Sequence, residues 1–131
     1  GIMDRAALVR DGGRRALGSD VGAGTEFSMI RVARAMLDHA KLLGTVPAER
    51  PAAAEAWWQI TAGNADALGF SDCGRLEPGA RADVVIIRPP RAWDRHPDPL
   101  SWLMHTWDDR WLERTVVAGV DRWRHDSPLA C

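Results

Sequence analysis

The segment ALGSDVGAGTEFSM, residues 16–29, holds the side chain with the clearest chemical potential in this sequence. A short apolar run ends at Asp20, and a loop containing Gly22 and Gly24 follows before a helical pattern begins. In α/β folds, the loops after the C-terminal ends of parallel strands form the rim that faces ligands. A carboxylate there can bind a metal ion, act as a general base or cap a turn, since Asp-Val-Gly is also ordinary turn chemistry. The residues alone leave these roles open.

Other kinds of catalytic or phosphate-binding loop do not match the sequence. A Rossmann fingerprint needs glycines spaced G-x-G-x-x-G, whereas Gly18, Gly22 and Gly24 run as G-x-x-x-G-x-G. A P-loop needs a lysine between its last glycine and the Ser or Thr, whereas Thr25 follows Gly24 directly. No G-x-S-x-G nucleophile motif occurs either. The chemistry of residues 16–29 is therefore not phosphate binding or a serine triad.

The histidines and cysteines do not form a self-contained metal motif. None of the four histidines is paired as H-x-H or H-E-x-x-H, and the H-x-E and P-C-x-x-C signature of zinc cytidine deaminases is absent. We expect all four to lie at the surface. They are His39, His96, His105 and His125. The two cysteines, Cys73 and Cys131, indicate neither a disulfide framework nor a zinc ribbon.

The aromatic composition is unusual, with seven tryptophans and no tyrosine. Such residues could stack against carbohydrate or single-stranded nucleic acid, but core and interface packing is the use we favour. Trp57 and Trp58 fall in one predicted helix, and Trp107 precedes the charged run at 108–110, Asp-Asp-Arg. We interpret that run as a surface or interface network of ion pairs rather than as a catalytic cluster.

The first half of the sequence has the pattern of an α/β protein. A helical pattern over residues 4–11 stops at Gly12-Gly13, and residues 14–19, RRALGS, read as a short strand. The loop that carries Asp20 and a second helix follow. Helix, strand, loop and helix in this order indicate parallel strands.

The second helix is the clearest element. Thr25 is a suitable N-cap, Glu26 adds negative charge to the first turn, and Gly44 ends the helix. Its apolar face is made by residues at spacings of three and four. These are Phe27, Ile30, Ala33, Met36 or Leu37, Ala40 and Leu43. A third helix is predicted over residues 52–62, with an interruption at Gly63-Asn64 and one more turn at 65–68.

Beyond residue 70 the pattern becomes mostly β. Glu77-Pro78-Gly79 fits a type II turn, and residues 84–87 form a β-branched run that predicts a strand buried on both faces. Residues 94–99 are predicted to be a loop. Residues 112–123 read as two strands that turn at Ala118-Gly119.

Length and charge limit the function classes. The 131 residues make one domain or a piece of something larger, and a formal net charge of −1 excludes a field that would hold nucleic acid or an acidic membrane surface. We find no apolar run near the length of about 18 residues that a spanning helix needs, and no signal peptide. We therefore expect a cytoplasmic protein.

Three passages resemble the C-terminal portion of metal-dependent amidohydrolases, and together they cover nearly the whole chain. The passage ADALGFSDCGRLEPGARADVVIIRP is similar to one shared across many amidohydrolases. ALGSDVGAGTEFSMIRV resembles the strand-eight motif of the guanine deaminases, and DPLSWLMHTWDDRWLERTVVAGVDRW resembles the ending of the same group.

The resemblance implies a fold and an activity. The fold would be α/β: residues 1–70 would form the last strand–helix units of a TIM-type (β/α)8 barrel, and residues 71–131 the C-terminal strands of a small composite β domain. The activity would be that of a zinc-dependent aminohydrolase that converts guanine and water to xanthine and ammonia in purine catabolism. Asp20 would be both a metal ligand and a catalytic acid–base group. We expect the parent enzyme to be a homodimer that acts on a purine or a related heterocycle.

Departures from the family pattern accompany the resemblance. The family's H-x-H, its further metal-binding histidines and a proton-shuttling glutamate would all precede Gly1, so we expect this chain alone to lose zinc and to be catalytically incomplete. Ala23 replaces a family loop glycine, and Trp107 stands where the family ending has glycine. Residues that bind substrate cannot be assigned from the sequence.

Two alternatives remain open at this level. The first is another amidohydrolase that acts on a different aminated or chlorinated heterocycle. The second is a non-catalytic dimerisation or binding module, which the missing ligands and the surplus of tryptophan favour.

Overall fold

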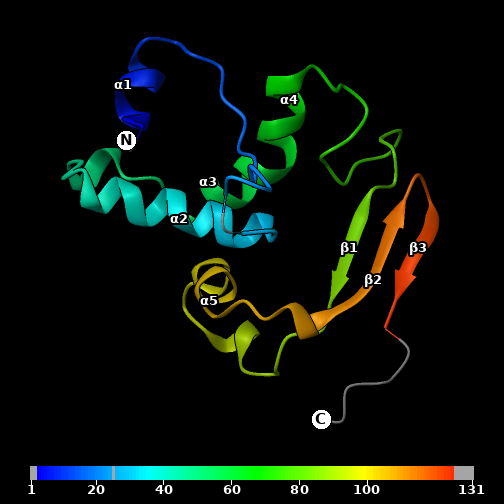
Figure 1. Ribbon diagram of the computed structural model, residues 1–131. Helices are drawn as coiled ribbons and strands as arrows, with labels where there is room; N and C mark the ends of the chain where they lie inside the picture. Colours follow the sequence, from blue (N-terminus) through cyan, green and yellow to red (C-terminus); the bar gives the residue numbers. More distant parts are fainter. Residues whose placement is uncertain (1–2, 25, 126–131) are drawn as a thin grey trace.

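The computed structural model describes residues 3–24 and 26–125, with the helices gathered to one side of a small sheet (Figure 1). Its helical segments are α1 Arg5–Arg10, α2 Met29–Leu42, η1 Pro47–Glu49, α3 Ala53–Trp58, η2 Gln59–Gly63, α4 Asn64–Leu68, η3 Trp93–Arg95, α5 Pro99–Thr106 and η4 Asp109–Trp111. Its strands are β1 Val84–Ile87, β2 Leu112–Val117 and β3 Val120–Arg124. Among the described residues, no helix is both long and apolar enough to cross a membrane. The mixed helix and strand content that the sequence predicts is confirmed.

Helix α1 forms where the sequence predicts it. Asp4 caps its N-terminus, because the Asp4 carboxylate accepts a hydrogen bond from the Ala7 backbone N–H at 3.0 Å. The helix ends before Gly12, whose φ of 70° is a left-handed conformation that glycine adopts without steric cost.

Helix α2 begins later than the sequence predicts. Its N-cap is Ser28, whereas the predicted N-cap, Thr25, lies outside the described residues. Glu26 therefore precedes the helix, and its carboxylate accepts hydrogen bonds from the backbone N–H groups of Phe27 at 3.0 Å and Ser28 at 3.2 Å. The prediction that Phe27 lies on the apolar face is wrong, because this side chain stands before the first helical turn and is 81% exposed.

The core is built where α2, α3 and α5 meet. Along α2, Ala33 and Leu37 are buried at a spacing of four residues, which confirms the predicted apolar face. They pack with Ala56 of α3 and Met104 of α5, and the small alanines let the helices approach closely. Partly buried side chains surround this cluster: Ile30, Met36, Trp57 and Ile60.

Helices α3, η2 and α4 form one continuous run from Ala53 to Leu68, so the predicted interruption at Gly63-Asn64 is wrong. The middle segment η2 is a π-helix, which closes its hydrogen bonds over five residues instead of four. Gly63 is buried inside this segment, where an added Cβ would lie 2.7 Å from the Trp58 ring. The glycine is there for close packing, not to end the helix.

Helix α5 is absent from the sequence prediction, which assigned residues 94–99 to a loop and the last third to strands. Its start follows ordinary capping rules, since an Asp98 side-chain oxygen accepts a hydrogen bond from the Ser101 N–H at 3.0 Å and Pro99 occupies the first turn. Its Leu103 and Met104 are buried. Helix α5 thus joins the helical core although it lies beyond residue 70.

The sheet is antiparallel, in the order β1-β2-β3. Its hairpin turns at Ala118-Gly119, and both residues have positive φ, 50° and 78°, as a type I′ turn requires. The strands and this turn confirm the sequence prediction. Burial of β1 on both faces is not observed, because Val85 is 55% exposed on a face that the described residues do not cover.

Residues 14–19 do not form the predicted strand. A strand is defined by backbone hydrogen bonds to a neighbour, and no strand of the described residues pairs with this segment. The nearest feature is an isolated parallel bridge between Val21 and Gly24. Residues 14–19 are nevertheless held in place by side chains, as described below.

One turn and one side-chain contact beside the sheet explain part of the shared amidohydrolase passage, and the turn confirms the sequence prediction. Glu77 accepts a hydrogen bond from the Ala80 N–H at 3.1 Å, and Gly79 between them has a φ of 91°, as a type II turn requires. An Asp83 side-chain oxygen accepts the Ala118 N–H at 2.8 Å. Asp83 therefore ties the start of β1 to the β2–β3 hairpin and has a structural use.

Candidate active site

Asp20 lies in a sharp, exposed turn directly after residues 14–19. Its backbone is left-handed, with a φ of 51°, a conformation that aspartate tolerates better than most residues. The Asp20 carbonyl accepts hydrogen bonds from the Ala23 N–H at 3.0 Å and from the Gly24 N–H. The turn thus presents the Asp20 side chain at the surface, where a ligand can reach it.

The glycines after Asp20 have separate steric reasons. Gly22 has a φ of 106°, which a residue with a Cβ rarely adopts. Gly24 approaches the chain so closely that an added Cβ would overlap the Ser19 carbonyl oxygen. Ala23, which replaces a glycine of the resembled family, has no positive φ, so this replacement costs no backbone strain.

The segment before Asp20 is held by two amide side chains of the α3–η2–α4 run. Asn64 accepts the Leu17 N–H on Oδ1 and donates from Nδ2 to the Leu17 carbonyl, both at 2.8 Å. Gln59, which is buried, donates from Nε2 to the Arg15 carbonyl at 3.0 Å. Sequence reasoning singled out neither residue for this use, although Asn64 stood out as an apparent interruption of the helix.

The described residues do not fit a complete zinc site. Zinc in proteins takes three or four ligands from His, Cys and carboxylates, and no group of three or more such residues is assembled within the described part of the chain. His39 and His96 are exposed, as predicted. His105 is half-buried and donates from Nδ1 to the Ser101 carbonyl at 2.9 Å within α5. Asp20 is thus a single candidate ligand.

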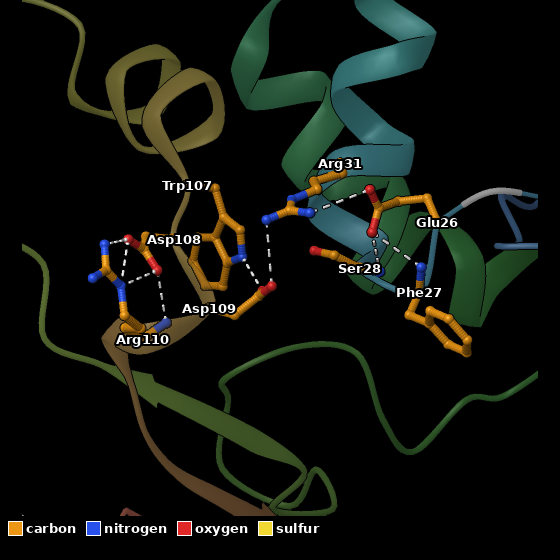
Figure 2. Close-up of polar contacts among 8 residues, drawn as sticks. All are labelled: Glu26, Phe27, Ser28, Arg31, Trp107, Asp108, Asp109 and Arg110. Atoms are coloured by element: carbon orange, nitrogen blue, oxygen red, sulfur yellow. Dashed lines mark hydrogen bonds and ion pairs between the residues drawn. The ribbon is translucent and has the colours of Figure 1, made fainter.

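A chain of polar contacts links the start of α2 to η4 (Figure 2). Arg31 lies between two carboxylates, with 3.4 Å from Nη1 to Glu26 and 3.4 Å from Nη2 to Asp109. Trp107 donates its indole N–H to the other Asp109 oxygen at 2.7 Å. The Ser28 N–H, together with Arg31, lowers the pKa of the Glu26 carboxyl. The ion-pair network predicted for residues 108–110 is therefore confirmed.

Four tryptophan rings next to this network contact one another one after the next. Trp57 meets Trp107 edge-on with ring centroids 6.3 Å apart, and Trp107 meets Trp111 in the same way at 5.9 Å. Trp111 stacks on Trp102 with an interplanar angle of 2°. Trp107 thus stands in place of the family glycine, and its ring contacts Trp57 of α3 on one side and Trp111 of η4 on the other. Packing, as predicted from the sequence, accounts for these residues.

The Asp108 carboxyl is expected to titrate at about 2, well below its ordinary value. Arg110 is the main cause, because it donates from Nε and Nη2 to Asp108 Oδ2 at 2.9 and 2.5 Å, and these bonds lower the pKa of Asp108 to about 2. Because the pKa is lowered on folding, any stabilisation from this pair is present above the ordinary carboxyl value near 4 and is lost as the pH falls toward 2. Carboxyl-carbon NMR during an acid titration measures this midpoint.

Arg110→Gln should raise the Asp108 midpoint toward about 4, because the charged donors are lost. Arg91→Gln removes the same charge from an exposed loop residue and should leave the Asp108 midpoint unchanged. An Asp108 midpoint near 4 in the unsubstituted chain would show that the pair drawn in Figure 2 does not persist in solution.

Comparison with known proteins identifies the family to which this sequence is similar. The model of the family described as Amidohydrolase family matches residues 1–120. Guanine deaminase of Escherichia coli strain K12 is 34% identical over 113 residues, which cover 79% of this chain and 25% of that protein. An imidazolonepropionase of Streptomyces griseus is 37% identical over 90 residues, or 66% of this chain and 20% of that protein. The chain thus spans about a quarter or less of the length of these relatives.

Solved structures agree with the sequence comparison. E. coli guanine deaminase superposes on 96% of this chain with a TM-score of 0.84 and 28% identity, and the match covers 31% of that structure. An adenosine deaminase from Xanthomonas campestris, solved with bound zinc, superposes on 94% of the chain with a TM-score of 0.76 and 25% identity, and the match covers 29% of that structure. With a family match over residues 1–120 and a shared fold, the chain belongs to the amidohydrolase family.

Proposed function

We propose that this chain is part of a zinc-dependent aminohydrolase that converts guanine and water to xanthine and ammonia. The observation that carries the proposal is the match to E. coli guanine deaminase in both sequence and structure, with 34% identity and a superposition over 96% of the chain. Residues 1–70 would contribute the last strand–helix units of a TIM-type barrel in the complete enzyme. Residues 71–131 would contribute the C-terminal strands of a small β domain.

Asp20 is the residue that we assign to the reaction. Deamination forms a bond from a water oxygen to the ring carbon, breaks the bond from that carbon to the exocyclic nitrogen, and moves protons from water to the departing ammonia. A carboxylate within reach of both atoms can accept the water proton and return it to the leaving nitrogen. The exposed turn supports this role, since Asp20 is exposed and the space beside Gly22 is open.

The chain alone is proposed to be inactive. Zinc is implied by the family and by the zinc-containing adenosine deaminase relative, but the described residues supply Asp20 without the further ligands that would retain the ion. We therefore expect the purified 131-residue chain to hold no stoichiometric zinc and to show no guanine turnover. Metal analysis and an assay for xanthine formation test both statements.

A chimera tests the activity itself. The segment of E. coli guanine deaminase that matches this chain would be replaced by residues 1–131, so that the scaffold supplies the rest of the enzyme. We expect this chimera to bind zinc and to form xanthine from guanine. A chimera that folds and binds zinc but does not deaminate guanine would contradict the proposed activity. Stoichiometric zinc together with guanine turnover in the isolated chain would contradict only the proposal that the chain alone is inactive.

A second candidate is a different member of the family, because an imidazolonepropionase is 37% identical over 90 residues. A parallel chimera in that scaffold, assayed on imidazolonepropionate, separates the two candidates. Activity confined to the guanine deaminase scaffold supports the first. Activity confined to the other scaffold supports the second, and both chimeras would also be assayed on adenosine derivatives and triazines.

A further inference from the structure

Three backbone polar groups of residues 15–17 are hydrogen-bonded by side chains: the Leu17 N–H, the Leu17 carbonyl and the Arg15 carbonyl. Asn64 both accepts from the Leu17 N–H and donates to the Leu17 carbonyl, each at 2.8 Å, so one amide side chain reproduces the paired bonds of a strand partner. Gln59 adds a bond from Nε2 to the Arg15 carbonyl at 3.0 Å. The two amides together bind alternate residues of the segment that leads to Asp20.

The π-helical segment η2 is what brings these amides together. In an α-helix, residues five apart point about 140° away from each other, because one turn takes 3.6 residues. The wider turn of η2 brings Gln59 and Asn64 to one side, where Gln59 Nε2 lies 3.4 Å from Asn64 Oδ1. A π-segment inside a helix often accompanies a functional site.

Burial restricts Gln59 to this use, and Asn64 beside it is half-buried. Gln59 is 1% exposed, and a buried amide is costly unless it is hydrogen-bonded, so its bonds to Arg15 and Asn64 are the reason that it is tolerated there. Gly63 closes the segment against the Trp58 ring, which leaves little room for the helix to shift. The amide pair is therefore a rigid anchor.

We infer that Asn64, supported by Gln59, is a positioning residue that sets the place of the Asp20 carboxylate. Asp20 follows Leu17 by three residues, a chain length of about 10 Å at most, so a displacement at Leu17 is passed directly to the turn at Asp20. Misplacement of a catalytic group by about 1 Å can reduce a rate by about 100-fold. The inference rests on the proposed function, because it requires Asp20 to act in the reaction.

The variants for the test are chosen to separate positioning from general stability. Asn64→Asp keeps the acceptor for the Leu17 N–H but loses the donor to the Leu17 carbonyl. Gln59→Leu removes the donor to Arg15 with an apolar side chain of similar size, so it is expected to fold even if the first variant does not. Thr106→Val is the matched control, since its hydroxyl donates to the Trp102 carbonyl within α5, outside the α3–η2–α4 run.

In the guanine deaminase chimera, Asn64→Asp is expected to lower kcat about 30-fold, and Gln59→Leu about 5-fold, with KM changed less than about 3-fold. Thr106→Val should leave kcat unchanged. The Asp20→Asn background is decisive: there, Asn64→Asp should have no further effect on kcat, because Asn64 acts through Asp20. The inference would be overturned if Asn64→Asp lowered kcat equally in the parent and in the Asp20→Asn chimera. It would also be overturned if Asn64→Asp alone left kcat within 2-fold of the parent.

A second measurement does not depend on activity. In the 131-residue chain, the Leu17 amide is expected to exchange with deuterium at least about 10-fold faster in Asn64→Asp than in the parent or in Thr106→Val, since the remaining bond is no longer paired. If the parent chimera fails to deaminate guanine, the proposed function fails, and the exchange rate still decides whether Asn64 holds this segment. Unchanged exchange at Leu17 would refute the anchor itself.

Discussion

Replacing Asp20 by asparagine in the guanine deaminase chimera is expected to lower kcat by about 1,000-fold. Asparagine keeps the size of the side chain and its tolerance for the left-handed backbone at φ 51°, so the turn should persist. It cannot accept the proton from water or return it to the leaving nitrogen. Steady-state rates of xanthine formation measure the effect.

The control for this result is Asp11→Asn, the same change of charge at another exposed aspartate that follows α1. We expect it to leave kcat and KM within 2-fold of the parent chimera. Thermal unfolding of both variants should match the parent, which separates loss of chemistry from loss of fold. If Asp20→Asn retained more than a tenth of the parent rate, Asp20 would have no essential acid–base role.

Met104→Ala should give the largest loss of stability, about 3 kcal/mol in the free energy of unfolding. Met104 is fully buried where α5 packs against α2 and α3, so truncation removes apolar contacts and leaves a cavity among rigid helices. Urea unfolding followed by tryptophan fluorescence measures the change, because four of the seven tryptophans pack against one another at α3, α5 and η4.

Met3→Ala is the matched control, since Met3 is 58% exposed and precedes α1. Its effect should be below about 0.5 kcal/mol, as for most surface substitutions. An equally small effect of Met104→Ala would mean that α5 does not dock on the helical core in solution. That outcome would remove the main link between residues 99–106 and the first half of the chain.

Local chemistry made several elements predictable from the sequence. Asp4 caps α1, the Pro78-Gly79 pair forms its turn, and the hairpin turns at Ala118-Gly119, each through contacts within a few residues. Helix α5 follows the same rules, and its Asp98-Pro99 signal could have been used to find it. Such elements depend on residues that are close together in the sequence, so they can be predicted from it.

Other features depend on residues far apart in the chain. The order of elements in the sequence predicts a strand over residues 14–19, but whether they form a ladder depends on which neighbour lies beside them. Here the partners are the side-chain amides of Gln59 and Asn64. The start of α2 at Met29 left Phe27 outside the apolar face. The spacing of apolar residues could not predict either the missing strand or the start of α2. It indicates which face of a helix is apolar, but not the residue at which the helix begins or which segment pairs with a strand.

The candidate site shows the same division. The sequence by itself determined that Asp20 is followed by a glycine loop, and its resemblance identified the family that the comparison confirmed. Only the tertiary structure decided that Asn64 hydrogen-bonds the backbone of Leu17, 47 residues earlier in the chain. This contact holds the segment that leads to Asp20. The physical reason is that a π-helical segment turns two amides to one side, and neither amino-acid type nor spacing reveals that geometry before the helix is packed.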